Sequence, residues 1–204
     1  MSHTADTDVI EAAKRGDCHI VYKMLSESAT DLDRVAAAAA SGGHSELVGV
    51  LTSKGASNLD WIASSAALGG HRQLLYQLID KGASDYDWIA ASAAESGYSD
   101  IVDDMIERGA GSIEHIAASA VEGGQRDLVN YLLDKGTLEG IDWVAEEAVN
   151  CGHLDIILDL LDRGADLDMI VSHASRFGHD DVINGLVERG VLTSERASLL
   201  MEEI

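Results

Sequence analysis

Histidine and cysteine are the residues of this sequence best suited to metal binding or nucleophilic chemistry, and it has eight of the first and two of the second. Four of the histidines directly follow a glycine: His44, His71, His153 and His179. They recur at a long, regular interval, so each repeat of the pattern supplies one imidazole, whereas a zinc site needs several ligands within reach. His173 and His179 are six residues apart, and a pair of metal ligands at these two positions remains an open alternative. Cys18 and Cys151 have no metal-ligand spacing.

The sequence lacks the motifs of the common catalytic and nucleotide-binding sites. It contains no HExxH, GxGxxG, GxxxxGK[ST] or GxSxG, no EF-hand loop and no paired CxxC. Cys151 has no neighbouring signal for a base, and we interpret it as a small buried residue. We therefore expect no enzyme activity, no cofactor and no metal ion, which leaves the classes of binding protein.

Two columns of a repeated pattern carry side chains that suit binding. The aromatic column holds all three tryptophans and comprises Trp61, Trp88, His115 and Trp143. The acidic column lies one residue earlier and comprises Asp33, Asp60, Asp87, Glu114, Asp142 and Asp168. The indoles either pack over one side of each repeat or anchor a partner, since tryptophan is enriched at interface hot spots. The carboxylates either cap helix N-termini or present negative charge to a partner, and both pairs of alternatives stay open.

A repeat of about 27 residues must position these columns. Its central glycine recurs at Gly16, Gly43, Gly70, Gly97, Gly124, Gly152 and Gly178. Four residues before it stands an alanine column: Ala12, Ala39, Ala66, Ala93, Ala120, Ala148 and Ala174. Eight residues before it stands a β-branched column: Val35, Ile62, Ile89, Ile116, Val144 and Ile170, with Asp8 as the exception. Columns this uniform are predicted to form the core, and alanine lets neighbouring helices approach closely.

Each repeat predicts two short helices separated by the central glycine. After Gly97, one apolar stripe with the 3.6-residue period is formed by Ile101, Val102, Met105 and Ile106. The acids on the other side of this helix are assigned to solvent. Gly109 predicts the end of the second helix, and Asp87 is predicted to be the N-cap of the first.

These residues resemble the ankyrin repeat. The family's paired alanines, Gly-His and aliphatic pairs before Gly-Ala are matched in residues 66–83 and 148–165, and the match covers about residues 7–192 in seven repeats. Ankyrin units have about 33 residues, and the segment between Gly-Ala and the next helix is shortened here. The resemblance implies an all-α, ankyrin-like α-solenoid of stacked helix pairs without β-hairpin fingers. It also implies a structural role for the histidines after the central glycines.

The array is expected to form one domain over residues 1–204, because it contains no linker. Residues 7–29 are more polar than the other repeats and are predicted to be an N-terminal capping repeat. Residues 30–192 comprise six further repeats. Residues 193–204 begin with a capping signal, Thr193-Ser194-Glu195, and are predicted to be a C-terminal capping helix.

The charge and composition of the chain narrow its partners and its location. Lys and Arg number 14 and Asp and Glu 36, which gives a formal charge of −22. Such a chain is poorly suited to phosphate backbones or anionic membranes, so we expect no direct nucleic acid and no membrane binding. Two cysteines and the lack of a visible secretory signal favour the cytoplasm. The sequence also resembles repeat arrays of intracellular bacterial pathogens and giant viruses. If the chain is an effector or a viral protein, the expected location is the cytoplasm of the host.

The resemblance implies a monomeric protein–protein interaction scaffold that binds a partner protein along its concave face. The predicted contact residues lie on the first helices and the turns before them: Trp61, Trp88, His115, Trp143, Asp60, Asp87, Glu114, Asp142, Leu68, Glu95 and Glu122. Carboxylates beside indoles would suit a partner with a basic segment. The alternative, motivated by the net charge, is an acidic decoy that occupies a basic nucleic-acid- or histone-like binding surface.

Overall fold

The computed structural model describes residues 2–27, 31–136 and 140–202. These residues form fifteen helices and no strand, so the predicted all-α fold without β-hairpin fingers is confirmed over the described part of the chain. The chain divides into two compact units, residues 1–111 and 112–204, which we describe separately and call the N-terminal and C-terminal units.

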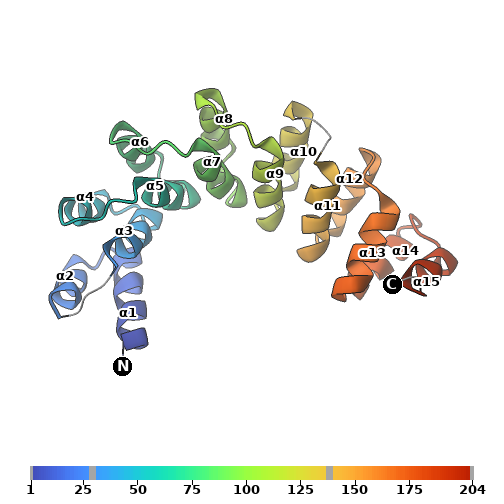
Figure 1. Ribbon diagram of the computed structural model, residues 1–204, viewed down its shortest axis with the longest axis horizontal. Helices are drawn as coiled ribbons and strands as arrows, with labels where there is room; N and C mark the ends of the chain where they lie inside the picture. The colour runs from blue at the N-terminus through green and yellow to red at the C-terminus, as the bar shows by residue number, and fades with distance from the viewer. Residues whose placement is uncertain (1, 28–30, 137–139, 203–204) are drawn as a thin grey trace. The chain divides into compact units, whose positions relative to one another are not determined.

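The N-terminal unit contains four helix pairs. Its first helices are α1 (Ser2–Arg15), α3 (Leu32–Ser41), α5 (Leu59–Leu68) and α7 (Tyr86–Glu95). Its second helices are α2 (Cys18–Glu27), α4 (Ser45–Ser53), α6 (Arg72–Asp80) and α8 (Ser99–Arg108). Within each pair a short turn at the central glycine joins the helices, and such short connections favour antiparallel neighbours (Figure 1).

The C-terminal unit contains three helix pairs and a final single helix (Figure 1). Its first helices are α9 (Ile113–Glu122), α11 (Ile141–Asn150) and α13 (Leu167–Phe177). Its second helices are α10 (Arg126–Lys135), α12 (Leu154–Asp162) and α14 (Asp180–Glu188), and the final helix is α15 (Ser194–Glu202). In both units the closest packing between successive repeats is between first helices.

The alanine and β-branched columns form the core, as the sequence predicts. All seven residues of the alanine column and all six Val or Ile residues of the β-branched column are fully buried. Asp8, the exception in the second column, is exposed. Alanine lets neighbouring helices approach closely, and its column lies where the first helices pack on one another.

Replacing Ala93 with leucine is therefore expected to lower the free energy of unfolding by about 1–3 kcal/mol through overpacking. Gln77→Leu is the matched control, because Gln77 is exposed on α6. Chemical unfolding of both variants measures the difference. Equal stabilities would mean that the alanine column does not limit the approach of the helices.

A polar cluster joins two second helices of the N-terminal unit, α6 and α8. Arg72 of α6 forms an ion pair with Asp104 of α8, and a second one, at 2.5 Å, with Asp100 of the same helix. The Tyr76 hydroxyl donates to Asp104. The guanidinium carbons of Arg72 and Arg108 lie 5.5 and 5.4 Å from the centre of the Tyr76 ring, within the range of cation–π attraction.

The C-terminal unit has a similar cluster between α10 and α12. Arg126 donates two hydrogen bonds to Asp159, at 2.6 and 2.7 Å. The Asn130 amide donates to the same carboxylate at 2.7 Å. Arg163, the C-cap residue of α12, donates to Asp134 of α10 at 2.6 Å. Each side chain of the cluster therefore links two successive repeats.

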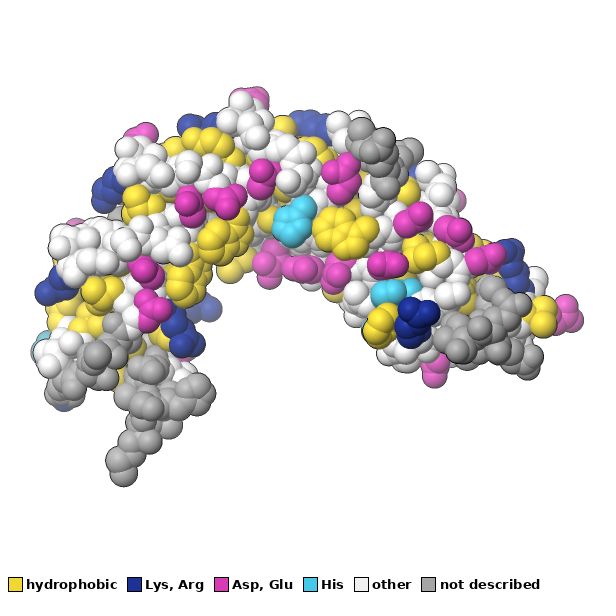
Figure 2. All heavy atoms as spheres, viewed as in Figure 1, with side chains coloured by type: hydrophobic (Ala, Val, Ile, Leu, Met, Phe, Trp, Pro, Cys, Tyr) yellow, Lys and Arg dark blue, Asp and Glu magenta, His cyan; other side chains and the backbone are white. Residues whose placement is uncertain are grey.

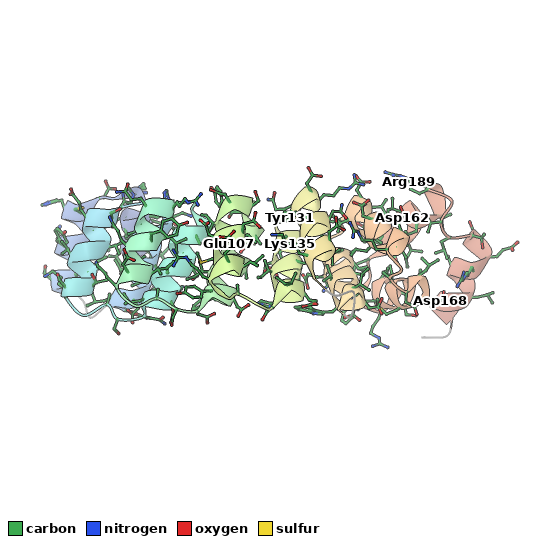
Figure 3. All side chains as sticks on the ribbon, turned by 90° about the horizontal axis from the view of Figure 1, so that it is seen from above. Glu107, Tyr131, Lys135, Asp162, Asp168 and Arg189 are labelled. Atoms are coloured by element: carbon green, nitrogen blue, oxygen red, sulfur yellow. The ribbon has the colours of Figure 1, made fainter. Side chains whose placement is uncertain are left out.

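Figure 3 shows further cationic side chains of the second helices in the C-terminal unit. Lys135 Nζ lies 4.5 Å from the centre of the Tyr131 ring on the same helix. Arg189, the C-cap residue of α14, pairs with Asp155 of α12 at 3.3 Å. The sequence-based assignment of second-helix acids to solvent is wrong for Asp104, which arginine and tyrosine side chains of the preceding repeat engage.

The Asp159 cluster predicts a pH dependence of stability. The hydrogen bonds from Arg126, with that from Asn130, hold the pKa of Asp159 below its ordinary value. A lowered folded pKa stabilises the fold above the unfolded carboxyl pKa of about 3.9, and this stabilisation is lost as the pH falls below that value. The melting temperature of Asp159→Asn is thus expected to fall less than that of the wild type between about pH 6 and about pH 3.

Asp162→Asn is the control for this comparison, because Asp162 is an exposed acid on the same helix. It should keep the pH dependence of the wild type. If the wild-type and Asp159→Asn curves run parallel in acid, the cluster does not stabilise the folded chain.

The turns at the central glycines carry the histidines for which the resemblance implies a structural role. His44 Nε2 donates to the Lys14 carbonyl and His71 Nε2 to the Ser41 carbonyl, each at 3.0 Å and each in the preceding repeat. These bonds tie each of the two repeats to the one before and support a structural role for His44 and His71, while the same role for His153 and His179 stays a prediction. His173 is engaged elsewhere, with Nε2 2.8 Å from Asn150 Oδ1.

Candidate binding face on the first helices

The aromatic column lies near the N-terminal end of the first helices. Trp61 and Trp88 belong to α5 and α7 of the N-terminal unit, and His115 and Trp143 to α9 and α11 of the C-terminal unit. Trp88 is 41% exposed and Trp143 44%, His115 is exposed, and Trp61 is half-buried. Packing thus covers part of each indole and leaves a large apolar surface open to solvent in two repeats.

The acidic column does not cap its own helices, so the N-cap interpretation is wrong. The N-caps lie two residues earlier, where side chains accept hydrogen bonds from the first turn: Asp31, Asn58, Asp85 and Asp166. Asp87, predicted as a cap, is already inside α7. Several repeats have an acid both at the cap and two residues later. The residue types alone therefore do not show which of the two positions is the cap.

The acidic column instead binds the backbone of the following repeat. Asp60 Oδ1 accepts hydrogen bonds from the backbone N–H of Ser84 at 2.6 Å and of Asp85 at 3.0 Å. The same contact recurs from Asp33 to the Ser57 and Asn58 amides, from Asp87 to the Gly111 amide and from Asp142 to the Asp166 amide. Each of these carboxylates therefore holds the turn that leads into the next first helix.

At the last repeat a side chain takes the place of that turn. Asp168 Oδ1 accepts from Arg196 Nη2 of α15 at 2.5 Å. The helix packs on α13 and buries Ala197, while Leu199 is 63% exposed. This contact supports the proposal that residues 193–204 cap the array, of which residues 203 and 204 lie outside the described part. The single domain of residues 1–204 and the capping repeat of residues 7–29, whose residues 28 and 29 are likewise not described, stay predictions.

Replacing Asp60 with alanine is expected to lower the free energy of unfolding by about 1–2 kcal/mol, since two amides lose a charged acceptor. Asp60→Asn keeps one acceptor oxygen and should cost less. Asp80→Ala, at an exposed acid of α6, controls for the loss of charge. Urea unfolding distinguishes them, and an Asp60→Ala variant as stable as Asp80→Ala would show that the contact is energetically neutral.

A second exposed column lies at the opposite end of the same helices. Leu68 is 38% exposed at the end of α5, and Glu95 and Glu122 are exposed at the ends of α7 and α9. Residues seven apart lie on the same side of a helix, so Trp61 and Leu68 share one face. Half-buried serines occupy the middle of this face: Ser65, Ser92 and Ser119. In each repeat, aromatic and variable residues thus flank a small centre.

In each unit we call the surface made of the aromatic column, the serines and the variable column the first-helix face. Exposed hydrophobic and acidic side chains lie beside one another over α5 and α7 in the N-terminal unit, and over α9 and α11 in the C-terminal unit (Figure 2). The sequence-predicted residues of each unit are therefore brought to one side of its helix stack. The hydrogen bonds of the acidic column are known only from the structure. They join residues 24 and 25 positions apart, so finding them in the sequence would have required comparing positions in successive repeats.

The described side chains hold no arrangement typical of a catalytic centre. Burial, with a smaller effect of the Glu147 carboxylate, raises the pKa of the Cys151 thiol and so disfavours its nucleophilic form. An open depression of about 400 Å³ is lined by Arg126, His153 and Arg189, but both arginines pair with aspartates. No group of three or more potential metal ligands occurs among the residues that the structure describes.

The comparisons with known proteins concern the fold. No protein-family model and no curated protein matches the sequence. The crystal structure of the human ASB11 ankyrin repeat domain is similar, with a TM-score of 0.54 and 23% identity over 78% of this chain and 85% of that chain. This chain has the ankyrin-repeat fold. The ankyrin-like array departs from the usual repeat in its 27-residue period and, over the described residues, in having no strand between helix pairs.

Two further features of this ankyrin-like chain concern membrane spans and cysteine pairing. None of its described helices combines the length and the apolar character needed to cross a membrane. Cys18 and Cys151 are both free thiols.

Proposed function

We propose that this chain is a non-enzymatic protein–protein interaction scaffold that binds a partner protein on its first-helix face. The observation that carries the proposal is the exposure of Trp88 and Trp143 beside fully buried columns on the same helices. Indoles are costly to leave in water and are enriched at the centres of protein interfaces, where they supply large contact areas.

The distribution of variation among the repeats supports the same face. The alanine column is invariant because it is buried, whereas the position two residues before the central glycine changes from leucine in one repeat to glutamate or arginine in others, as in Leu68, Glu95 and Arg176. A stacked array that varies only its exposed positions can present a different contact in each repeat while keeping its core. The proposed scaffold acts as a monomer in the cytoplasm, a location that the free thiols support.

The decoy function has less support. An acidic surface that imitates a nucleic acid requires carboxylates available to a basic protein. Asp100, Asp104 and Asp159 are instead paired with arginines of neighbouring repeats, and Asp60 holds backbone amides. Salt separates the two functions, because electrostatic binding weakens steeply with ionic strength and aromatic contacts much less.

Affinity capture from the native cell extract tests the scaffold function when variants are compared. The double variant Trp88→Ala/Trp143→Ala removes the two most exposed indoles. Tyr22→Ala/Tyr131→Ala is the matched control, because these tyrosines are 39% and 37% exposed on second helices. Proteins captured by the wild type and the control but lost from the tryptophan variant would support the first-helix face. Partners lost only from the tyrosine variant would place the binding surface on the second helices.

A further inference from the structure

Helices α9 and α11 combine an exposed aromatic pair with an excess of acids. The rings of His115 and Trp143 are stacked, with centroids 5.8 Å apart and planes 10° from parallel. The two helices contain five acids and neither lysine nor arginine. The acids are Glu114, Glu122, Asp142, Glu146 and Glu147.

The second helices of the same unit are different in charge. Arg126 of α10 and Arg163, the C-cap residue of α12, pair with Asp159 and Asp134. The first helices α9 and α11 contain no such arginine. The nearest basic groups on the adjoining first helix, α13, are His173, 4.0 Å from Glu146, and the exposed Arg176.

The acids of α11 lie close to the place that a partner side chain stacked on the Trp143 ring would occupy. Glu146 and Glu147 follow Trp143 by three and four residues, so they occupy the next turn on the same side of α11. Asp142 directly precedes the indole, and its Oδ1 accepts a hydrogen bond from the Asp166 amide. The field of these carboxylates reaches the adjoining thiol, because Glu147 and Glu122 both add to the effect of burial in raising the pKa of Cys151. The same field favours a cation.

We propose that this part of the first-helix face binds an arginine-bearing basic segment of the partner protein, an inference that rests on the proposed scaffold function. A guanidinium group lies against the His115–Trp143 pair and donates to the carboxylates that follow it on α11. Arginine fits better than lysine because its planar group stacks on aromatic rings and its forked donors suit carboxylates. Charge complementarity selects the basic segment, and the ring pair selects arginine within it.

Isothermal titration with defined peptides tests this binding chemistry. The probes are three capped peptides of equal length in which glycine alternates with arginine, with lysine or with citrulline, the neutral isostere of arginine. At about 0.15 M salt, the arginine peptide is expected to bind about 3- to 5-fold more tightly than the lysine peptide. The citrulline peptide should not bind. Equal affinity for arginine and lysine, or binding of citrulline, would overturn the proposal.

Variants of the full chain locate the site. Trp143→Ala is expected to weaken binding of the arginine peptide about tenfold, while Tyr131→Ala, at a 37% exposed ring of the second helix α10, leaves it unchanged. Glu147→Gln should weaken binding, and Glu188→Gln, at an exposed acid of the second helix α14, should not. Trp143→Phe, which retains a smaller ring and should bind with intermediate affinity, replaces Trp143→Ala if the alanine variant melts early. Equal losses for the Trp143 and Tyr131 variants, or for the Glu147 and Glu188 variants, would indicate diffuse attraction and contradict the site.

The failure of this inference is distinguishable from the failure of the scaffold function. If the arginine peptide does not bind but Trp88→Ala/Trp143→Ala still loses a native partner, the scaffold stands and the arginine-bearing segment is wrong. If the arginine peptide binds as expected but Trp88→Ala/Trp143→Ala still captures the native partner, the arginine site is supported. In that case the native partner docks on a surface other than the first-helix face.

Discussion

Replacing Gly70 with alanine is expected to lower the free energy of unfolding by about 2–5 kcal/mol, through backbone strain and a steric clash. Gly70 has a φ of +72°, which costs a residue with a Cβ about 1–2 kcal/mol. A Cβ there would also lie 2.4 Å from the Tyr98 ring of the next repeat. Ring and glycine are thus fitted to one another across the repeat boundary. Urea unfolding measures the loss.

Gly178 provides the matched control for this prediction. It occupies the same place in its repeat, with a φ of +80°, but a Cβ there would meet nothing within 4 Å. Gly178→Ala should cost about 1–2 kcal/mol from backbone strain alone. In a Tyr98→Ala background, Gly70→Ala should cost no more than that. If Gly70→Ala is equally costly with and without the tyrosine ring, the contact between repeats does not contribute.

Trp88→Ala is expected to weaken the complex with the partner by about 2 kcal/mol or more, which corresponds to about 30-fold in the dissociation constant. The indole is 41% exposed, so much of its surface remains available to a partner in the folded chain. Titration calorimetry of the purified complex measures the loss, and Tyr22→Ala on α2 serves as the comparison in the same unit.

The stability of the Trp88→Ala variant decides how this result is interpreted. Its melting temperature should stay close to that of the wild type, so that lost affinity reports on the missing contact. If affinity holds while the melting temperature falls, the aromatic column has a packing role and the partner binds elsewhere.

The repeat, the helix pairs and the buried columns could be predicted because they are periodic in the sequence. An invariant alanine such as Ala93 reveals its environment through comparison of the repeats, without any alignment of relatives. The predicted stripe after Gly97 is largely correct, with Ile101 and Met105 buried. Its regularity follows from packing every repeat against the same kind of neighbour.

The contacts between repeats could not be predicted in the same way. Because aspartate is a strong capping residue, the sequence predicts a helix cap at Asp87. Asp85 is the cap instead, and Asp87 accepts a hydrogen bond from the Gly111 amide. The Arg126–Asp159 pair joins residues 33 positions apart. These interactions depend on the offset between stacked helices, which the pattern of a single repeat does not contain.

The three tryptophans allow the most direct test of the central claim that a partner docks on the first-helix face. Each indole gives one Nε1–H signal in a proton–nitrogen NMR spectrum, and all three indoles lie in the aromatic column. Addition of the purified partner is predicted to shift or broaden the signals of Trp88 and Trp143, assigned by single Trp→Phe variants. Unchanged indole signals, with changes confined to backbone amides of the second helices, would contradict the account.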